Sequence, residues 1–429
     1  MRRAAYLLAA MLAALPAVAH AEHWVTAWTG SAQGPYPSGF PSAQPVLTFA
    51  FPMPDTGAHD QSFRLIVRPD IGGPTARLRL SNVLGTRPVT FDHVSVGRQL
   101  SGAEVVAHSL RPVSFGGAAT VTVPPGQSVW SDPAEVAGAG GKLAVSFHVA
   151  GDSGPMTWHA KALTTSYLSA PGAGAAGAAA ESELGFPYTT TSWYFLDALD
   201  MAAPEGTRAV VAFGDSITDG TASTLNGDDR WPDVLSRRLH ARYGDRFAVV
   251  NEGIGGNQVI GPASYTPQTP FPGGPSSKDR LERDIAALSG VGTVIWLEGI
   301  NDLGTQGNAT PQAIAAGMTE GVARLRRLIP GVRIIGATAT SALGSSNPAH
   351  GSPAEDAARQ TLNGLIRTGG LFDAVLDFDA ATRDPNTGSL RAAFVPESTT
   401  GGAGDKLHPN RAGYQAMGAA IPLEVIAGP

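Results

Sequence analysis

The stretch AVVAFGDSITDG spans residues 209–220. Its apolar first part predicts a buried strand, and the Gly/Asp turn that follows places Ser216 at the C-terminal end of that strand. An open α/β sheet presents a nucleophile at such a position. Apolar runs and helical patterns continue to alternate downstream, which predicts a parallel sheet covered on both faces by helices. The predicted strands are 209–213, 247–251, 293–297, 333–338 and 374–378, with helices at 231–243 and 310–329.

A different period governs the first half of the chain, from residue 22 to about 199. Apolar and polar residues alternate there, which predicts half-buried antiparallel strands. Several short strands separated by Gly and Pro favour a β-sandwich of jelly-roll type. We read the Ala/Gly-rich stretch at 170–180 as a surface loop. The strand candidates are 63–67, 76–80, 89–96 and 143–149, and the predicted domains are 22–203 and 204–429.

Composition restricts the classes of protein that this chain can belong to. Its 429 residues are 43% hydrophobic and 15% charged, as in a soluble globular protein. The net charge of −6 and the lack of a basic stripe disfavour a nucleic-acid partner. There is no cysteine, which excludes disulfides, thiol chemistry and cysteine-metal sites.

Residues 1–21 have the pattern of an export signal. Arg2 and Arg3 precede a short apolar run at 4–15, and the small residues at 19 and 21 suit cleavage before Glu22. The apolar run is too short for a membrane-spanning helix, which needs about 20 residues. We therefore expect an exported protein, periplasmic or extracellular, without stable membrane insertion.

Ser216 needs a neighbouring base, because a free serine hydroxyl is a poor nucleophile. The second half of the chain offers His240, His350 and His408. His408 has Asp405 three residues before it, so the carboxylate could hold one imidazole nitrogen while the other faces the serine. Taken alone, this Asp-x-x-His pattern favours a helix-capping turn, whereas the other motifs favour the catalytic interpretation.

Two further segments offer donors for an oxyanion. Asn301 could supply a side-chain N–H and Gly256 a backbone N–H, beside the backbone N–H of Ser216. Losing one such donor typically costs about 10²–10³ in rate. Each glycine-rich segment, by itself, also suits an ordinary turn.

Competing motifs fail on particular positions. A dinucleotide fingerprint beginning at Gly253 would need a third glycine where Gln258 stands. The Gly-x-Ser-x-Gly elbow of α/β-hydrolases is missing around Ser216. A cation site would leave the serine and the asparagine without a role, although carboxylates and one imidazole are available for it: Asp215, Asp219, Asp302 and His408.

The four segments, in this order, resemble the SGNH/GDSL family of serine ester hydrolases. They are 213–220, 251–257, 299–302 and 405–409. The resemblance implies a three-layer α/β/α, flavodoxin-like domain that needs no metal or organic cofactor. It also implies site roles, with a one-residue ambiguity between Gly255 and Gly256: the nucleophile would be Ser216, the base His408 and its orienting acid Asp405, with oxyanion donors from Ser216, Gly256 and Asn301.

The first half is similar to the N-terminal β-domain of some secreted bacterial members, through residues 24–28 and 77–88. In those proteins such a domain helps to bind substrate or shape the site. A Pro/Gly-rich segment at 258–278 departs from the family pattern. It suits either an irregular lip over the crevice or a plain surface loop.

The function implied by the resemblance is that of a secreted serine esterase acting on short O-acyl esters, with acetylated carbohydrate as the leading substrate. A lipase or arylesterase is the second hypothesis. A non-catalytic carbohydrate-binding protein on a hydrolase scaffold is the third. A phosphoesterase fits less well, because no Lys/Arg cluster surrounds the motifs. Nothing in the sequence fixes the oligomeric state.

Overall fold

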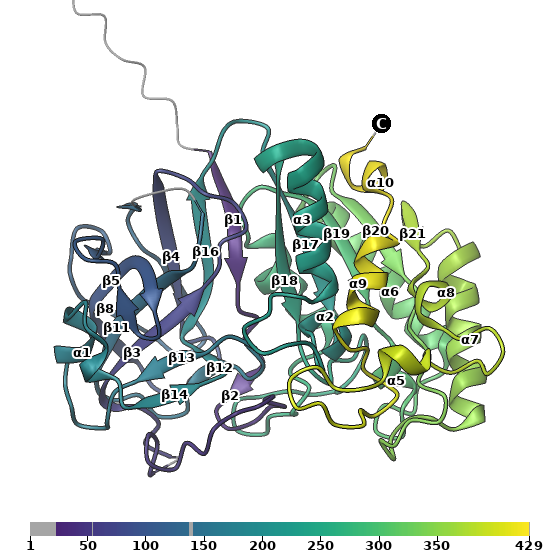
Figure 1. Cartoon of the computed structure of the whole chain (residues 1–429), viewed down its shortest axis with the longest axis horizontal. Coiled ribbons are helices and arrows are strands. Elements are labelled where there is room, and N and C mark those ends of the chain that lie inside the picture. The colour runs from purple at the N-terminus through teal and green to yellow at the C-terminus, as the bar shows by residue number, and fades with distance from the viewer. Residues whose placement is uncertain (1–22, 54, 137–139, 429) are drawn as a thin grey trace, which may run out of the picture.

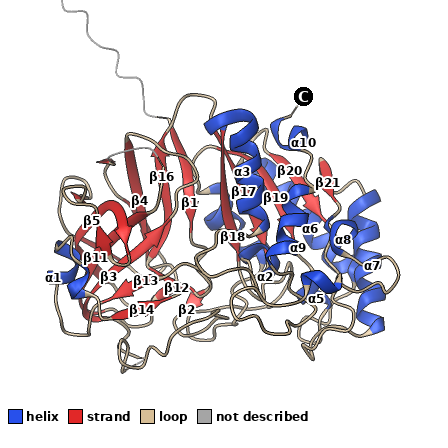
Figure 2. Cartoon of the chain, viewed as in Figure 1, coloured by secondary structure: helices blue, strands red, loops and turns tan. Residues whose placement is uncertain are grey.

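The computed structural model describes residues 23–53, 55–136 and 140–428. The predicted signal peptide at 1–21 lies outside these residues. Antiparallel sheets fill the N-terminal part of the molecule, and a parallel sheet flanked by helices fills the C-terminal part (Figures 1 and 2). Within the described residues, no helix combines the length and apolar composition that crossing a membrane requires.

Two antiparallel sheets carry most of the N-terminal region. The first, here called the interface sheet, has the order β1-β16-β4-β10, with β9 also paired to β4: β1 Trp24–Thr29, β4 Thr75–Ser81, β9 Ser128–Trp130, β10 Ala134–Glu135 and β16 Leu196–Ala202. The second, the outer sheet, has the order β14-β13-β3-β11-β5-β6, with β7 and β8 also on β5: β3 His59–Val67, β5 Val89–Ser101, β6 Glu104–Val105, β7 Arg111–Pro112, β8 Val121–Val123, β11 Leu143–Asp152, β13 Ser166–Leu168 and β14 Tyr188–Thr190. A small sheet joins β15 Trp193–Tyr194, β12 Thr157–His159 and β2 Gly34–Pro35. The antiparallel character is confirmed, and the jelly-roll arrangement stays a prediction.

The parallel sheet contains every strand predicted for the second half. Its order is β18-β17-β19-β20-β21, the 2-1-3-4-5 order of a doubly wound sheet. The strands are β17 Arg208–Gly214, β18 Phe247–Gly253, β19 Val291–Leu297, β20 Arg333–Ala337 and β21 Ala374–Leu376. The helices are α2 Ser216–Asp219, α3 Trp231–Tyr243, α4 Ser277–Leu281, α5 Ile300–Leu303, α6 Pro311–Leu328, α7 Pro353–Thr368, α8 Phe378–Thr382, α9 Arg411–Ala419 and α10 Leu423–Ala427. The boundary predicted at 203/204 falls between β16 and β17 and stays a prediction.

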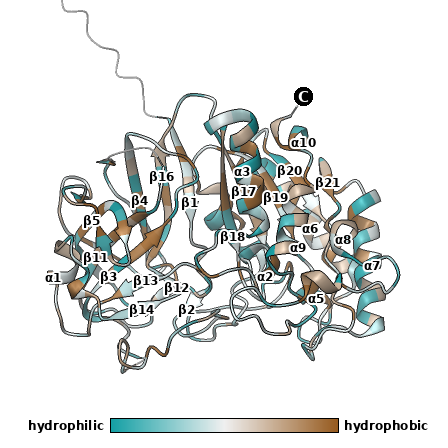
Figure 3. Cartoon of the chain, viewed as in Figure 1, coloured by the Kyte–Doolittle hydropathy of each residue, from teal (hydrophilic) through white to brown (hydrophobic). Residues whose placement is uncertain are grey.

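Alternate residues of β17 pack on opposite faces of the parallel sheet. Val211 and Phe213 join the apolar cluster that includes residues of α6 and α7. Val210 and Ala212 join the cluster that includes residues of α3 and α9. Both faces of β17 are therefore shielded from solvent, which explains its unbroken apolar run. Figure 3 shows hydrophobic residues gathered in the strands of this sheet.

The helix predicted at 310–329 is confirmed as α6. The Thr310 side chain caps its first turn by accepting a hydrogen bond from the backbone N–H of Ala313. Pro311 takes the first helical position, where its missing N–H costs nothing. Local capping chemistry alone was enough to place this end of the helix.

The prediction of a surface loop at 170–180 is wrong in part. Residues Ala176–Ala179 form α1, and Ala178 is fully buried. The reason is Arg64, whose buried guanidinium donates to the carbonyls of Ala103 and Gly177. Small residues let the backbone come close enough to supply these acceptors.

The charged side chains of strand β4 contact the second half of the chain. Arg79 is buried and donates to the carbonyl of Ala287. Arg77 is partly exposed and donates to the hydroxyl of Ser289. Arg79 donates to Asp197 at 2.5 Å, and Arg77 donates to Asp200 at 2.8 Å. Asp200 also accepts from the hydroxyl of Ser289, at the start of the loop before β19. The period-two pattern predicted the strand correctly, but its polar face forms an interface between the two halves.

Candidate active site

The turn after β17 fixes the position of Ser216. Asp215 caps the short helix α2 by accepting a hydrogen bond from the backbone N–H of Ile217 at 2.9 Å. Burial, together with the nearby charge of Glu298, raises the pKa of Asp215 well above its usual range. Ser216 is the first residue of α2 and is 6% exposed. The cap therefore holds the serine backbone rigidly at the end of the strand.

The structure brings Ser216, His408 and Asp405 into one hydrogen-bonded line. His408 Nε2 lies 2.8 Å from Ser216 Oγ, and His408 Nδ1 lies 2.6 Å from Asp405 Oδ2. The other carboxylate oxygen of Asp405 accepts from the backbone N–H groups of Leu407 and His408. Burial acts to raise the pKa of Asp405, but these hydrogen bonds hold it below its usual range. An ionised carboxylate thus orients the imidazole toward the serine.

The two adjacent glycines after β18 have different roles. The backbone N–H of Gly255 donates to Asp219 Oδ2 at 2.9 Å and is therefore occupied. Among the described residues, no hydrogen bond uses the N–H of Gly256, whose φ is +80°. Asn301 Nδ2 donates to the carbonyl of Asn257 at 3.0 Å, which leaves its second N–H for a ligand. Of the two glycines, Gly256 is thus the better candidate for an oxyanion donor.

A cavity of about 400 Å³ opens over Ser216, Gly256, Asn301 and His408. Most of its other side chains are polar: Ser42, Lys161, Thr221, Gln258, Gln306, Asn347 and His350. Of the segment 258–278, Gln258 lines this cavity, which favours the surface-loop interpretation for the rest of the segment.

Two segments of the N-terminal region line the same cavity, and sequence reasoning missed both. Phe40, Pro41 and Ser42 form part of its wall. A Cβ added to Gly256 would lie 2.6 Å from Phe40 Cε2, so the ring packs directly on this glycine. No local motif marks these residues, because they belong to an irregular loop 170 residues or more before the serine.

Lys161 is the second contribution from the N-terminal region. It is 3% exposed, lines the cavity, and donates from Nζ to the hydroxyl of Thr221. Burial lowers the pKa of Lys161, against the opposing pull of Asp219 and Asp405. The ammonium therefore offsets carboxylate charge beside the serine.

His159, from the N-terminal region, supports the loop after β18 that contains Gly255 and Gly256. Its Nδ1 lies 2.9 Å from the carbonyl of Ser31, and its Nε2 lies 3.2 Å from Asp219 Oδ1. Asp219 in turn holds the N–H of Gly255. Through this chain of contacts, the N-terminal region fixes the loop that carries Gly256.

Arg280 ties together the strand ends beneath the site. Its guanidinium, 1% exposed, donates to the carbonyls of Gly214 and Glu252 at 2.9 Å, and its Nε donates to Asn257 Oδ1 at 2.8 Å. These three residues end β17, end β18 and support Asn301. No sequence pattern marks this role of Arg280, because the residue stands in a charged stretch typical of a solvated helix.

The two other histidines of the second half lie in different places. His350 lines the cavity, and burial lowers its pKa. His240 bonds Asp70 and Asp245 on the side of α3, outside the cavity lining. His350 therefore lines the candidate site, although its Pro/Gly/Ser-rich surroundings contain no motif that would have indicated this.

The four residues considered for a cation do not converge. Asp302 accepts from the backbone N–H groups of Val259 and Ile260, and burial raises its pKa to about 7. Asp215 caps α2 and Asp219 holds the N–H of Gly255. Among the described residues, these side chains do not form a group with metal-ligand spacing. Each carboxylate has a structural role instead.

Comparison with known proteins agrees with the arrangement of the motifs. Residues 212–416 match the model of the GDSL-like Lipase/Acylhydrolase family. No curated protein matches the chain. Similar solved structures include a carbohydrate acetylesterase from Sinorhizobium meliloti, with 18% identity and a TM-score of 0.39 over 52% of this chain and 99% of that one. They also include an aryl esterase from M. smegmatis, with 19% identity and a TM-score of 0.38 over the same shares.

These structural likenesses are too low to carry an argument about substrate. The family match includes all the site residues that were predicted from the sequence: Ser216, Gly256, Asn301, Asp405 and His408. Residues 212–416 therefore form a GDSL-like lipase/acylhydrolase domain, which makes the protein a carboxylic ester hydrolase.

Proposed function

We propose that the protein is an exported serine esterase that removes short acyl groups, above all acetyl, from carbohydrate esters. The observation that carries this proposal is the hydrogen-bonded line Ser216–His408–Asp405, with distances of 2.8 and 2.6 Å, at the base of a cavity that also presents hydroxyl, amide and ammonium groups. A hydroxyl bonded to an oriented imidazole is the arrangement of an activated serine nucleophile.

In the proposed reaction, Ser216 Oγ attacks the ester carbonyl carbon while His408 Nε2 takes the hydroxyl proton. Negative charge develops on the carbonyl oxygen, where the N–H groups of Ser216, Gly256 and Asn301 stabilise it. The tetrahedral intermediate collapses, and the alcohol leaves with the proton from His408. A water molecule, deprotonated by His408, then attacks the acyl-enzyme, and the acid leaves as His408 returns the proton to Ser216 Oγ. Asp405 stabilises the imidazolium during both acylation and deacylation.

Two features of the cavity support a small acyl group and a hydroxyl-rich alcohol. Phe40 packs on Gly256 and limits the space beside the oxyanion donors. Hydroxyl, amide and ammonium groups on the remaining wall suit hydrogen bonding to a sugar. Small-molecule or carbohydrate esters are thus the proposed substrates.

A lipase or arylesterase is the second candidate. The observation that favours it is Phe40 itself, which is 44% exposed at the cavity wall and offers a face for an aryl ring or acyl chain. The relative rates on short, long and aryl esters distinguish it from the first candidate.

Export, the domain boundary and the sandwich arrangement are also proposals. Export is supported by the signal pattern at residues 1–21, and N-terminal sequencing of the secreted or periplasmic protein tests it: a start at Glu22 is expected. The boundary at 203/204 is supported by the change from antiparallel pairing in β16 to parallel pairing in β17.

The decisive experiment uses the protein from Glu22 onward, beside Ser216→Ala. Hydrolysis of p-nitrophenyl acetate, butyrate and laurate is measured, together with acetate release from acetylated polysaccharide. Fast acetate release that disappears in Ser216→Ala supports the proposal. A preference for laurate favours a lipase. Inactivity of both proteins, with binding to glycans, favours a non-catalytic protein, and equal activity of both excludes Ser216 as the nucleophile.

A further inference from the structure

A bulge in the outer sheet brings three potential metal ligands to one face. Strands β5 and β11 are antiparallel neighbours, and Asp92 pairs with His148. The register shifts at this point, so β5 contains one extra residue between Asp92 and Ser95, and His93 adopts a φ of +48°. Consecutive strand residues normally point to opposite faces, but a bulge can re-aim a side chain. The bulge here lets Asp92 and His93 face the same space.

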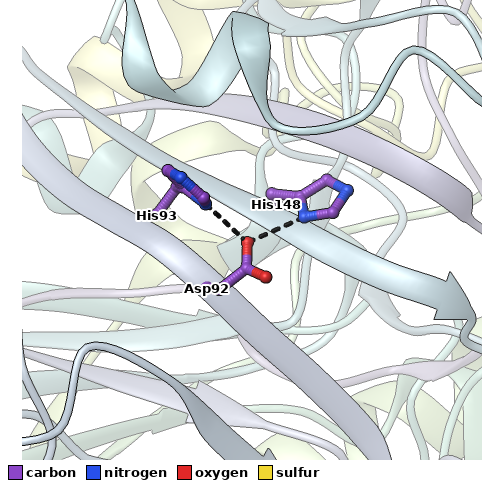
Figure 4. Close-up of side chains that lie close together, drawn as sticks. All are labelled: Asp92, His93 and His148. Atoms are coloured by element: carbon purple, nitrogen blue, oxygen red, sulfur yellow. Dashed lines mark hydrogen bonds and ion pairs between the residues drawn. The ribbon is translucent and has the colours of Figure 1, made fainter.

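The three side chains converge on one carboxylate oxygen. Asp92 Oδ1 lies 2.8 Å from His93 Nδ1 and 2.7 Å from His148 Nδ1 (Figure 4). Their ligand atoms all lie within 4.8 Å of one another. A tetrahedral ion bound at about 2.0–2.1 Å would separate such atoms by roughly 3.3 Å. An opening of about half an ångström, which the exposed His93 ring can supply, would admit the ion.

A further carboxylate orients the buried histidine. His148 is 5% exposed, and its Nε2 lies 3.0 Å from Asp60 Oδ1 on strand β3. A metal-bound histidine typically donates its other ring N–H to a carboxylate in this way. If His148 Nε2 donates its proton to Asp60, a second proton must lie between His148 Nδ1 and Asp92. A bound cation would replace this second proton.

We propose that Asp92, His93 and His148 bind one divalent transition-metal ion of the zinc class, with Asp60 as the outer partner of His148. Two imidazoles and one carboxylate are the ligand types that Zn²⁺ prefers, and positions toward solvent remain for water. The ion would join β5 to β11 and so stabilise the outer sheet. The site shares no residue with the esterase cavity and does not depend on the proposed function.

Zinc titration of the chelator-treated full chain by calorimetry tests this site, with metal content measured after desalting. One zinc per chain is expected, with a higher melting temperature in Zn²⁺ than in EDTA. His93→Asn, chosen because asparagine tolerates a positive φ, and His148→Gln should both lose the ion. Asp60→Asn should weaken binding about 10–100-fold.

His240→Gln is the matched control, since His240 also stands between two carboxylates but, among the described residues, has no second histidine at metal-ligand spacing. It should keep the ion. Circular dichroism verifies that each variant is folded, and the exposed His93 variant keeps the test valid if His148→Gln unfolds. Absence of zinc binding in the wild type, or equal binding in His93→Asn and wild type, would show a hydrogen-bonded cluster only and overturn the proposal.

Discussion

The two halves of the molecule reach the same cavity by different routes. In the parallel-sheet half, Ser216 and Asn301 stand where strands end, as the topology of such sheets requires. In the antiparallel half, Phe40 and Lys161 reach the cavity because that half packs on the other. Strand β1 lies beside β18 without pairing in its sheet, and Thr29 Oγ1 donates to the carbonyl of Asn251 (Figure 1).

The difference separates two kinds of site residue. Residues at strand ends can be found from sequence, because their position follows from local structure. Residues that reach the cavity because the antiparallel half packs on the other half show only general patterns in the sequence, such as the alternation in β4. We expect substitutions of both kinds of residue to lower activity, with the larger losses at the strand ends of the parallel sheet.

The largest expected effect is that of Asp405→Asn. We expect kcat on p-nitrophenyl acetate to fall by about 10⁴-fold, because the amide no longer holds the reactive tautomer of His408 or stabilises its cation. Stopped-flow or steady-state kinetics measures the loss. Glu397→Gln is the control, since Glu397 also accepts a backbone N–H, that of Thr399 at 2.9 Å, but bonds no histidine among the described residues. Equal losses in both variants would contradict a specific role of Asp405.

Asn301→Ala should have the next largest effect. A fall in kcat of about 10²–10³-fold, with little change in KM, is expected because the lost donor acts on charge that develops in the transition state. Gln306→Ala removes another carboxamide from the cavity wall and should change kcat far less. A change confined to KM in Asn301→Ala would mean that this side chain binds the ground state instead.

Lys161→Met tests the contribution of the antiparallel half. We expect kcat/KM to fall by about 10–100-fold, the effect of losing a hydrogen bond from a charged group. Loss of the ammonium also leaves the charges of Asp219 and Asp405 less compensated near the oxyanion. Lys142→Met is the matched control, because Lys142 also bridges the halves, at 3.7 Å from Asp228, away from the cavity. Unchanged kcat/KM in Lys161→Met would contradict a contribution of the antiparallel half to activity.

The smallest expected effect concerns the pH dependence of docking. The hydrogen bond to Asp70 raises the pKa of His240 across the interface between the halves. The contact should therefore stabilise the fold fully below the usual histidine pKa of about 6.5, and lose this effect as pH rises through the higher folded value. The melting-temperature difference between wild type and His240→Gln, about 1–2 °C for this partly exposed pair, should shrink from pH 6 to pH 9. A difference that grows with pH would contradict the assignment.

Much of the second half could be predicted from the sequence. The strands around residues 209 and 293 and the helix after Thr310 agree with the structure within a few residues. The candidates Ser216, Asp405 and His408 are brought together as expected. Arg280 could not be predicted, because its burial results from three carbonyl and amide acceptors on separate segments.

Periodicity and turn chemistry act over a few neighbouring residues, so the parallel sheet, the order of its motifs and the residue types at its strand ends could be predicted from the sequence. The folded structure was needed to show that the charged side chains of β4 contact the second half, that Phe40 and Lys161 line the cavity, and that a bulge brings His93 and His148 to Asp92. These features depend on contacts between segments far apart in the chain, whose packing no local pattern encodes.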